Sequence, residues 1–430
     1  MLPQIVNDIL KKLREKGVPV GGNDRAEEEQ AFPPTFEEEL DCALVESETF
    51  KMIEVDAEGE KIIFKAFLDG IQRTMILPYR IPLPNGALVP LHVAHIAAGI
   101  LFRDEKGRLY MDQSLIASRL LLLGPFQGIQ ETGGPSFGEL EGNDVIKDTD
   151  DKVYDFPSHQ NEWIICDTTF PGTDEERDKR QEEALRGDKL FDERIIRSRA
   201  QGRTAVLRQR LELVVLAKFR RENPNDFILV DGPLFFLDKW RRKAAKTLGN
   251  ILSCKPQEIE DALLKNAVGL IKTFRLRPKD ERRELRIEQL SKMGEGYRSP
   301  VLRLSREVDI KGGKFDEESN SYAGAHLTWY TRLRLLRSEP PYGLRGLVRL
   351  DVHRSTFDIK NADALEPRTF EQYKPIVDKI TRAIWKEKWP GMHHSRDFRE
   401  TQIYPIEQVE KILKASIYPK RLLMHIFNIQ

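Results

Sequence analysis

The chain has little cysteine and no excess of charge of either sign. Only three cysteines occur among its 430 residues, Cys42, Cys166 and Cys254, and their number and spacing match neither a metal-binding motif nor a disulfide framework. Lysine plus arginine and aspartate plus glutamate each number 69, which excludes a chain-wide basic field for nucleic acid. Any contact with nucleic acid must therefore come from a local patch, and the low cysteine content favours a reducing compartment.

Long apolar runs and familiar catalytic motifs are also missing. No run approaches the ~18–20 apolar residues that span a bilayer, and the first residues, MLPQIVNDILKKLREKG, lack the apolar core of a signal peptide. We therefore expect a cytoplasmic protein with no membrane association. The patterns GxxxxGK[ST], GxGxxG, GxSxG, HExxH and paired CxxC are absent, so a partner must supply any ATP-driven step.

The N-terminal part differs in composition from the rest. The segment 1–60 combines a predicted amphipathic helix at 3–16, a linker rich in Gly, Pro and Glu at 18–35, and an acidic stretch. Thirteen acidic residues against one lysine occur from 27 to 60. This stretch is either a solvated surface or a docking surface for a basic partner. We expect the main folded part to occupy 61–430.

Strand-like and helix-like segments alternate irregularly, which predicts an α/β fold with a mixed sheet flanked by helices. Predicted strands lie at 61–69, 87–102, 162–170, 227–236, 268–274, 300–304 and 344–353. Predicted helices lie at 113–124, within 173–222, and at 237–249, 256–265, 369–387 and 405–415, whereas 127–160 has the composition of a loop.

Two predicted strands each deliver an Asp-Gly pair. KIIFKAFLDG ends in Asp69 and Gly70, and FILVDGPLFF carries Asp231 and Gly232. Asp-Gly is a common turn signal. Two carboxylates at neighbouring strand ends would instead suit Mg²⁺ or Mn²⁺, which prefer carboxylate oxygens and can activate water for phosphodiester hydrolysis. From the residues alone, the turn and the metal site remain open alternatives.

A third carboxylate, Glu212, lies on the predicted helix that leads into the Asp231 strand. It borders the apolar stripe of that helix, so it can reach toward the strand, and Arg208 four residues earlier could hold it. The alternative is an ordinary Arg–Glu pair on the surface, which contributes only tenths of a kcal/mol.

Six short motifs occur in the order found in one known family. They are FLDG at 67–70, RLE at 210–212, LVDGPL at 229–234, GLIKT at 269–273, GYRSPVLRL at 296–304 and YPIEQV at 404–409. Together they resemble the NurA nucleases, which process DNA ends with a HerA-type hexameric ATPase. The resemblance implies an RNase H-like fold, a nuclease that depends on Mn²⁺ or Mg²⁺, and a homodimer that docks on its translocase in DNA repair or antiviral defence.

Carried over position by position, the resemblance makes Asp69, Glu212 and Asp231 the metal ligands and Tyr404 an active-site tyrosine. One departure concerns a histidine that the family often has eight positions after this tyrosine, where this chain has Ile412. The separation of Asp69 from Glu212 is also longer than in compact members, so we place an insertion around 103–200.

The segment 272–306 carries eleven basic and five acidic residues, the best local candidate for phosphate contact. Within it we predict that Lys272 and Arg298 bind nucleic-acid phosphate. The competing hypothesis is a catalytically weak or inactive adaptor of the same fold that binds a translocase or DNA, and Ile412 favours it. A glycosidase-type carboxylate pair is a weaker alternative, because aromatic residues make up only 8% of the chain.

Overall fold

The computed structural model describes residues 39–55, 62–82, 88–131, 145–147, 163–169, 192–234, 247–272, 277–279, 287–304, 326–335, 343–360, 365–389, 401–419 and 422–423. The predicted helix at 3–16, most of the predicted loop at 127–160 and most of the predicted helix at 237–249 lie outside these residues. All statements of structure below concern the described part of the chain.

One large mixed sheet organises the described residues. Its strands are β1 (Glu39–Leu44), β2 (Ile53–Glu54), β3 (Ala66–Pro82), β4 (Leu88–Arg103), β5 (Leu109–Gly124), β6 (Val145–Lys147), β7 (Trp163–Asp167), β8 (Ile228–Asp231), β9 (Ala267–Ile271), β10 (Arg277–Lys279), β11 (Tyr297–Arg298), β12 (Leu302–Leu304), β13 (His326–Arg332) and β14 (Leu347–His353). The order is β10-β1-β12-β13-β14-β9-β8-β3-β4-β5-β7-β6, with β11 pairing β13 and β2. The predicted mixed α/β sheet is confirmed.

The helices are mostly short. They are α2 (Phe126–Glu131), α5 (Glu193–Glu222), η3 (Pro256–Glu258), α7 (Ile259–Leu264), α8 (Ile287–Ser291), η6 (Arg354–Phe357), α9 (Pro367–Phe370), η8 (Glu371–Tyr373), α10 (Lys374–Glu387) and α11 (Tyr404–Ser416). The predicted helices at 256–265, 369–387 and 405–415 are thereby confirmed, and α5 is the described part of the one predicted within 173–222. None of the described helices is both long enough and apolar enough to cross a membrane.

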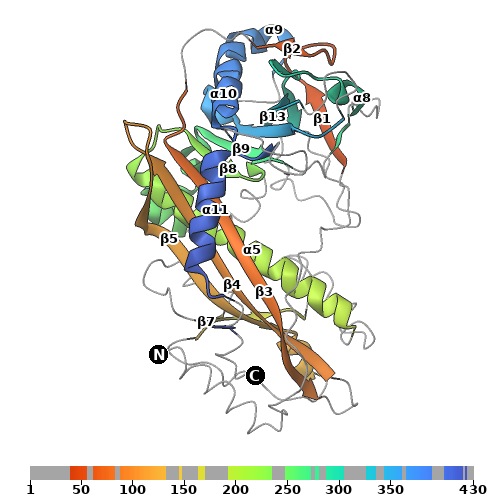
Figure 1. Cartoon of the computed structure of the whole chain (residues 1–430), viewed down its shortest axis with the longest axis vertical. Helices are drawn as coiled ribbons and strands as arrows, with labels where there is room; N and C mark the ends of the chain where they lie inside the picture. The colour runs from red at the N-terminus through yellow and green to blue at the C-terminus, as the bar shows by residue number, and fades with distance from the viewer. Residues whose placement is uncertain are drawn as a thin grey trace.

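Three long antiparallel strands, β3, β4 and β5, extend away from the part of the molecule that holds α10 and β13 (Figure 1). The prediction of a helix at 113–124 was wrong, because these residues form most of β5. The end of this strand, Leu120–Leu123, is buried throughout, between β4 and β7 and beneath α5. A strand buried on both faces loses the alternation of apolar and polar residues and so resembles a buried helix.

The sheet separates two apolar cores. The α5-side core includes Leu68 of β3 and Val230 of β8 with the apolar face of α5. The α11-side core includes Phe67 and Leu229, the neighbours of those residues in the same strands, with α10 and α11. Since successive side chains of a strand point to opposite faces, α5 and α11 cover opposite faces of β3. This arrangement fixes which face each candidate site residue occupies.

Residues 39–55 contribute strands to the sheet. The start of the folded part therefore lies before residue 61, where the sequence places it. β1 pairs with β12 and β10, and β2 pairs with β11. Cys42 and Phe50 enter a third apolar cluster with Leu290, Met293 and Tyr330. The acidic stretch is therefore part of the folded body from Glu39 to Val55.

Candidate active site

The carboxyl ends of β8 and β9 form the floor of the candidate site. These strands are parallel, with Asp231 paired to Leu270. Gly232 then takes a positive φ of 108°, and its amide donates to the Leu270 carbonyl at 2.8 Å. A Cβ at Gly269 would lie 2.7 Å from the Gly232 oxygen, so both glycines are needed where the chain leaves β8. Carboxyl ends of parallel strands are the usual place for ligands in α/β sheets.

Asp69 lies next to Asp231 across the β3–β8 pairing. The strands are parallel with Leu68 opposite Val230, which makes the two aspartates the next pair along. Alternation from Phe67 and Leu229, both in the α11-side core, places both aspartates on the α11 side. β8 ends at Asp231 while β3 continues to Pro82, so Asp69 stands where the β8 edge of β3 becomes open. The predicted adjacency of the aspartates is thus present.

Glu212 lies on α5 and approaches β3 at Gly70, from the face opposite to the one that carries the two aspartates. Its carboxylate fills the place of a side chain at Gly70, because a Cβ there would lie 2.0 Å from Glu212 Oε1. Arg208 holds this arrangement, with Nη1 donating to the Gly70 carbonyl at 2.9 Å and Nε lying 3.4 Å from Glu212 Oε1. Glu212 is only 5% exposed, so the alternative of a surface Arg–Glu pair is excluded.

The two Asp-Gly pairs therefore serve different purposes. Gly232 makes the turn that the sequence suggested for both. Gly70 instead keeps an extended backbone within β3, and its missing side chain admits the Glu212 carboxylate. The turn alternative therefore does not hold at Asp69, because β3 continues through Gly70 to Pro82. A glycine inside a strand pattern is the signal for such a close approach.

Lys272 follows β9 and joins the aspartates. Its Nζ lies 2.7 Å from Asp231 Oδ1. Its charge also acts on Asp69, as do those of Asp231, Glu212 and Arg208. The structure therefore brings together four of the predicted site residues, Asp69, Glu212, Asp231 and Lys272.

Burial and mutual repulsion perturb the acids of this site. Burial raises the pKa of Asp69 well above its usual value, and the neighbouring Asp231 and Glu212 carboxylates raise it further. Burial likewise raises the pKa of Glu212 to about 6, against the opposing effect of Arg208. Buried carboxylates with such pKa values mark a site where a cation would be bound favourably.

The residues present fit a hard divalent cation by ligand type. Three carboxylates supply the oxygen ligands that Mg²⁺ and Mn²⁺ prefer, and the gap at Gly70 admits one of them. Among the described residues, no three His, Cys, Asp or Glu side chains already form a metal-binding group. Asp231 is engaged by Lys272 and Glu212 by Arg208, so these carboxylates are neutralised by lysine and arginine in place of a preformed cage.

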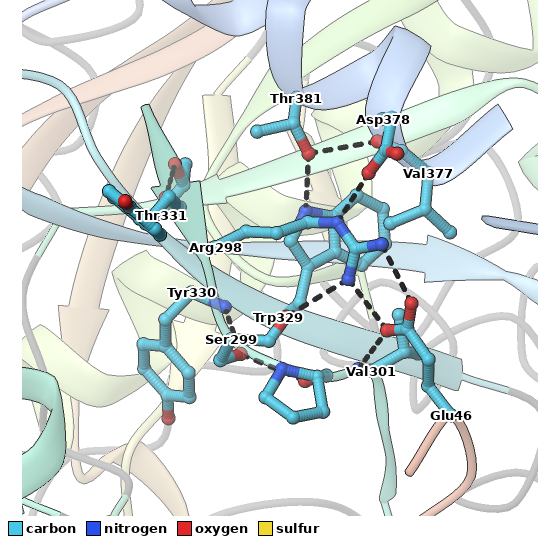
Figure 2. Close-up of polar contacts among 12 residues, drawn as sticks. Glu46, Arg298, Ser299, Val301, Trp329, Tyr330, Thr331, Val377, Asp378 and Thr381 are labelled. Atoms are coloured by element: carbon cyan, nitrogen blue, oxygen red, sulfur yellow. Dashed lines mark hydrogen bonds and ion pairs between the residues drawn. The ribbon is translucent and has the colours of Figure 1, made fainter. Parts of the chain in front are cut away.

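The prediction that Arg298 binds nucleic-acid phosphate was wrong, because its side chain is not available to a phosphate. Its side chain is completely buried and binds both Glu46 carboxylate oxygens at 2.6 and 2.7 Å, while its Nε donates to Asp378 of α10 at 2.6 Å (Figure 2). Glu46 also accepts from the Val301 amide at 2.8 Å. Arg298 thus joins the N-terminal segment, β11 and α10. The sequence around Arg298 indicates a basic patch, because the acidic partners Glu46 and Asp378 are far away in the sequence.

Tyr404 begins α11 and is 40% exposed. Its ring contacts that of Trp389 at a centroid distance of 5.2 Å, and Lys411 lies over the same Trp389 ring. Tyr404 thus lies beside Trp389, and its predicted role in the active site stays a prediction. Ile412, where the resembling family often has histidine, is an exposed residue about two turns further along α11.

Comparison with known proteins adds no identity. No family model matches the chain. No curated protein matches it either. The resemblance to the NurA nucleases therefore stays a prediction from short motifs, and the geometry of Asp69, Glu212, Asp231 and Lys272 carries the functional argument.

Proposed function

We propose that this protein is a divalent-metal-dependent DNA nuclease that hydrolyses phosphodiester bonds. The observation that carries the proposal is the convergence of Asp69, Asp231 and Glu212, from β3, β8 and α5, at the carboxyl ends of two parallel strands. Three buried or half-buried carboxylates lie close enough that burial and their mutual repulsion raise the pKa of Asp69, although Lys272 and Arg208 each pair with one of them. Carboxylates are the ligand type that metal-dependent phosphodiester hydrolysis uses, which supports the proposal.

Each residue has a distinct role in this proposal. Asp69, Asp231 and Glu212 would hold Mn²⁺ or Mg²⁺, which when bound supplies an activated water and stabilises the leaving oxygen. Arg208 orients Glu212 by holding its carboxylate against Gly70. Lys272 lies on the more exposed side, so its ammonium can contact a phosphate oxygen of the substrate.

The partners follow from the motif resemblance. A NurA-type nuclease would have an RNase H-like fold, act as a homodimer, and receive DNA from a HerA-like hexameric ATPase. This agrees with the absence of an ATP-binding motif in the chain. Repair of DNA ends and defence against invading DNA are both compatible with such a pair.

One set of observations favours a catalytically weak adaptor instead. The carboxylates do not form a ready metal-binding group within the described residues, and an exposed Ile412 stands where the family often has histidine. In this alternative the same fold binds a translocase or DNA without efficient cleavage.

The deciding experiment incubates the purified chain with end-labelled linear DNA and Mn²⁺, with and without a HerA-type ATPase. Asp231→Asn removes one ligand charge. Asp358→Asn is the matched control, because Asp358 is an exposed aspartate that pairs with Lys265 away from the site. We expect cleavage by the wild type and by Asp358→Asn, and none by Asp231→Asn. No cleavage by the wild type, alone or with the ATPase, would support the adaptor.

A further inference from the structure

The ammonium of Lys272 lies against one of the carboxylates that the proposed function makes a metal ligand. Its Nζ lies 2.7 Å from Asp231 Oδ1, and its charge also acts on the Asp69 carboxylate. Resting on the function proposed above, we infer that Lys272 acts as a built-in second cation, so that each chain binds one divalent ion and not two.

The sheet itself positions this lysine. Asp231 pairs with Leu270 of β9, and Lys272 is the next residue beyond Leu270 on the same face. Asp231 and Lys272 are therefore diagonal neighbours on adjacent strands, a spacing that a long side chain spans. The ion pair follows from the strand register and does not depend on a flexible loop.

Burial divides the site into an inner and an outer part. The side chains of Lys272 and Asp231 are 19% and 27% exposed. Asp69 and Glu212 are deeper, at 7% and 5%. Lys272 thus closes the outer end beside Asp231, which leaves the two deeper carboxylates, Asp69 and Glu212, for the single ion.

Charge balance points the same way. When ionised, Asp69, Glu212 and Asp231 carry three negative charges, and Lys272 and Arg208 return two positive ones. One divalent ion leaves the site with a single positive charge, which one phosphodiester neutralises. A second divalent ion would add two uncompensated positive charges beside an ammonium and a guanidinium, which Coulomb repulsion disfavours.

The experiment counts bound Mn²⁺ directly, by electron paramagnetic resonance of the free ion during titration and by isothermal calorimetry, without any nuclease assay. Lys272→Met removes the charge and keeps much of the stem, whereas Lys272→Arg keeps the charge. Lys265→Met is the matched control, since Lys265 pairs with Asp358 outside the site. Circular dichroism and thermal unfolding establish that each variant is folded before titration.

We expect one Mn²⁺ per chain for the wild type, Lys272→Arg and Lys265→Met, and a second ion for Lys272→Met. Two ions bound by the wild type, or one ion still bound by folded Lys272→Met, would overturn the inference while leaving the metal site intact. A wild-type chain that binds no Mn²⁺ would instead reject the metal site and the proposed function with it.

Discussion

The Glu212 carboxylate occupies the space that a side chain at residue 70 would fill. A Cβ built on Gly70 lies 2.0 Å from Glu212 Oε1, closer than any real contact. The helix α5 and the strand β3 thus meet at a glycine, and the site depends on that residue remaining small.

Gly70→Ala is expected to displace the Glu212 carboxylate while the fold survives. Overpacking of a buried site costs about 1–3 kcal/mol, and we expect Mn²⁺ affinity to fall at least ~10-fold, which corresponds to about 1.4 kcal/mol. Calorimetric titration and urea unfolding measure the two effects. Gly202→Ala is the control, because Gly202 lies in α5 with open space where a Cβ would be added, and the helix should gain up to ~1 kcal/mol in propensity. Unchanged Mn²⁺ affinity in Gly70→Ala would contradict the role of this gap.

Glu212 should give the metal-free protein an unusual pH dependence. Burial raises its pKa from the ordinary value of 4.5 to about 6 in the folded chain. A carboxyl with a raised folded pKa binds more protons when folded, so its contribution is fully present below about pH 4.5 and is lost as the pH rises through about 6. A pKa change of this size corresponds to about 2 kcal/mol.

Urea unfolding across this pH range, without metal, measures the effect as the difference between wild type and Glu212→Gln. The glutamine variant cannot ionise, so its stability relative to the wild type should rise by about 2 kcal/mol from acidic to neutral pH. Parallel stability curves for the two proteins would show that Glu212 does not titrate as its surroundings indicate.

Arg298→Met should strongly lower the free energy of unfolding without changing the candidate active site directly. The substitution leaves the fully buried Glu46 carboxylate without its cation, and breaking a buried pair in this way costs about 3–5 kcal/mol. The double variant Glu46→Gln with Arg298→Met removes both charges and should recover part of that loss. Thermal and urea unfolding give the comparison. A stable Arg298→Met protein that fails only to bind DNA would restore the phosphate role that the structure denies to Arg298.

Binding of Mn²⁺ or Ca²⁺ should raise the melting temperature. At an ion concentration ~100-fold above the dissociation constant, the folded state gains about 2.7 kcal/mol. Differential scanning calorimetry measures this gain with and without ion. Asp231→Asn should abolish the shift and Asp358→Asn should keep it. An equal shift in both variants would place the ion elsewhere on the chain.

The sequence predicts the strands of this fold better than its N-terminal boundary. The strands that carry Asp69 and Asp231 have dense apolar residues and a terminal Asp-Gly, which local pattern reading detects. The buried end of the strand at 109–124 lacks alternation, so its sequence pattern predicts a helix over 113–124. The acidic composition of residues 39–55 predicts a segment outside the folded part, because it hides the buried Cys42, Val45 and Phe50.

The candidate site also has residues that the sequence predicts and residues that it does not. Asp69, Glu212, Asp231 and Lys272 could be predicted because each stands in a recognisable local motif. The purpose of Gly70 and the burial of Arg298 could not, since each depends on a residue distant in sequence. Glu212 lies on a separate helix, and Glu46 precedes Arg298 by 252 residues.

That last separation has a consequence for biosynthesis. β1 finds its partner β12, and Glu46 finds its cation, only after some 250 further residues have been made, as the 252-residue span of the Glu46–Arg298 pair requires. Contacts so distant in sequence slow folding and leave unpaired strand edges exposed meanwhile. We therefore expect the nascent chain to remain incompletely folded until β12 has left the ribosome. Until then we expect its folding to depend on chaperones.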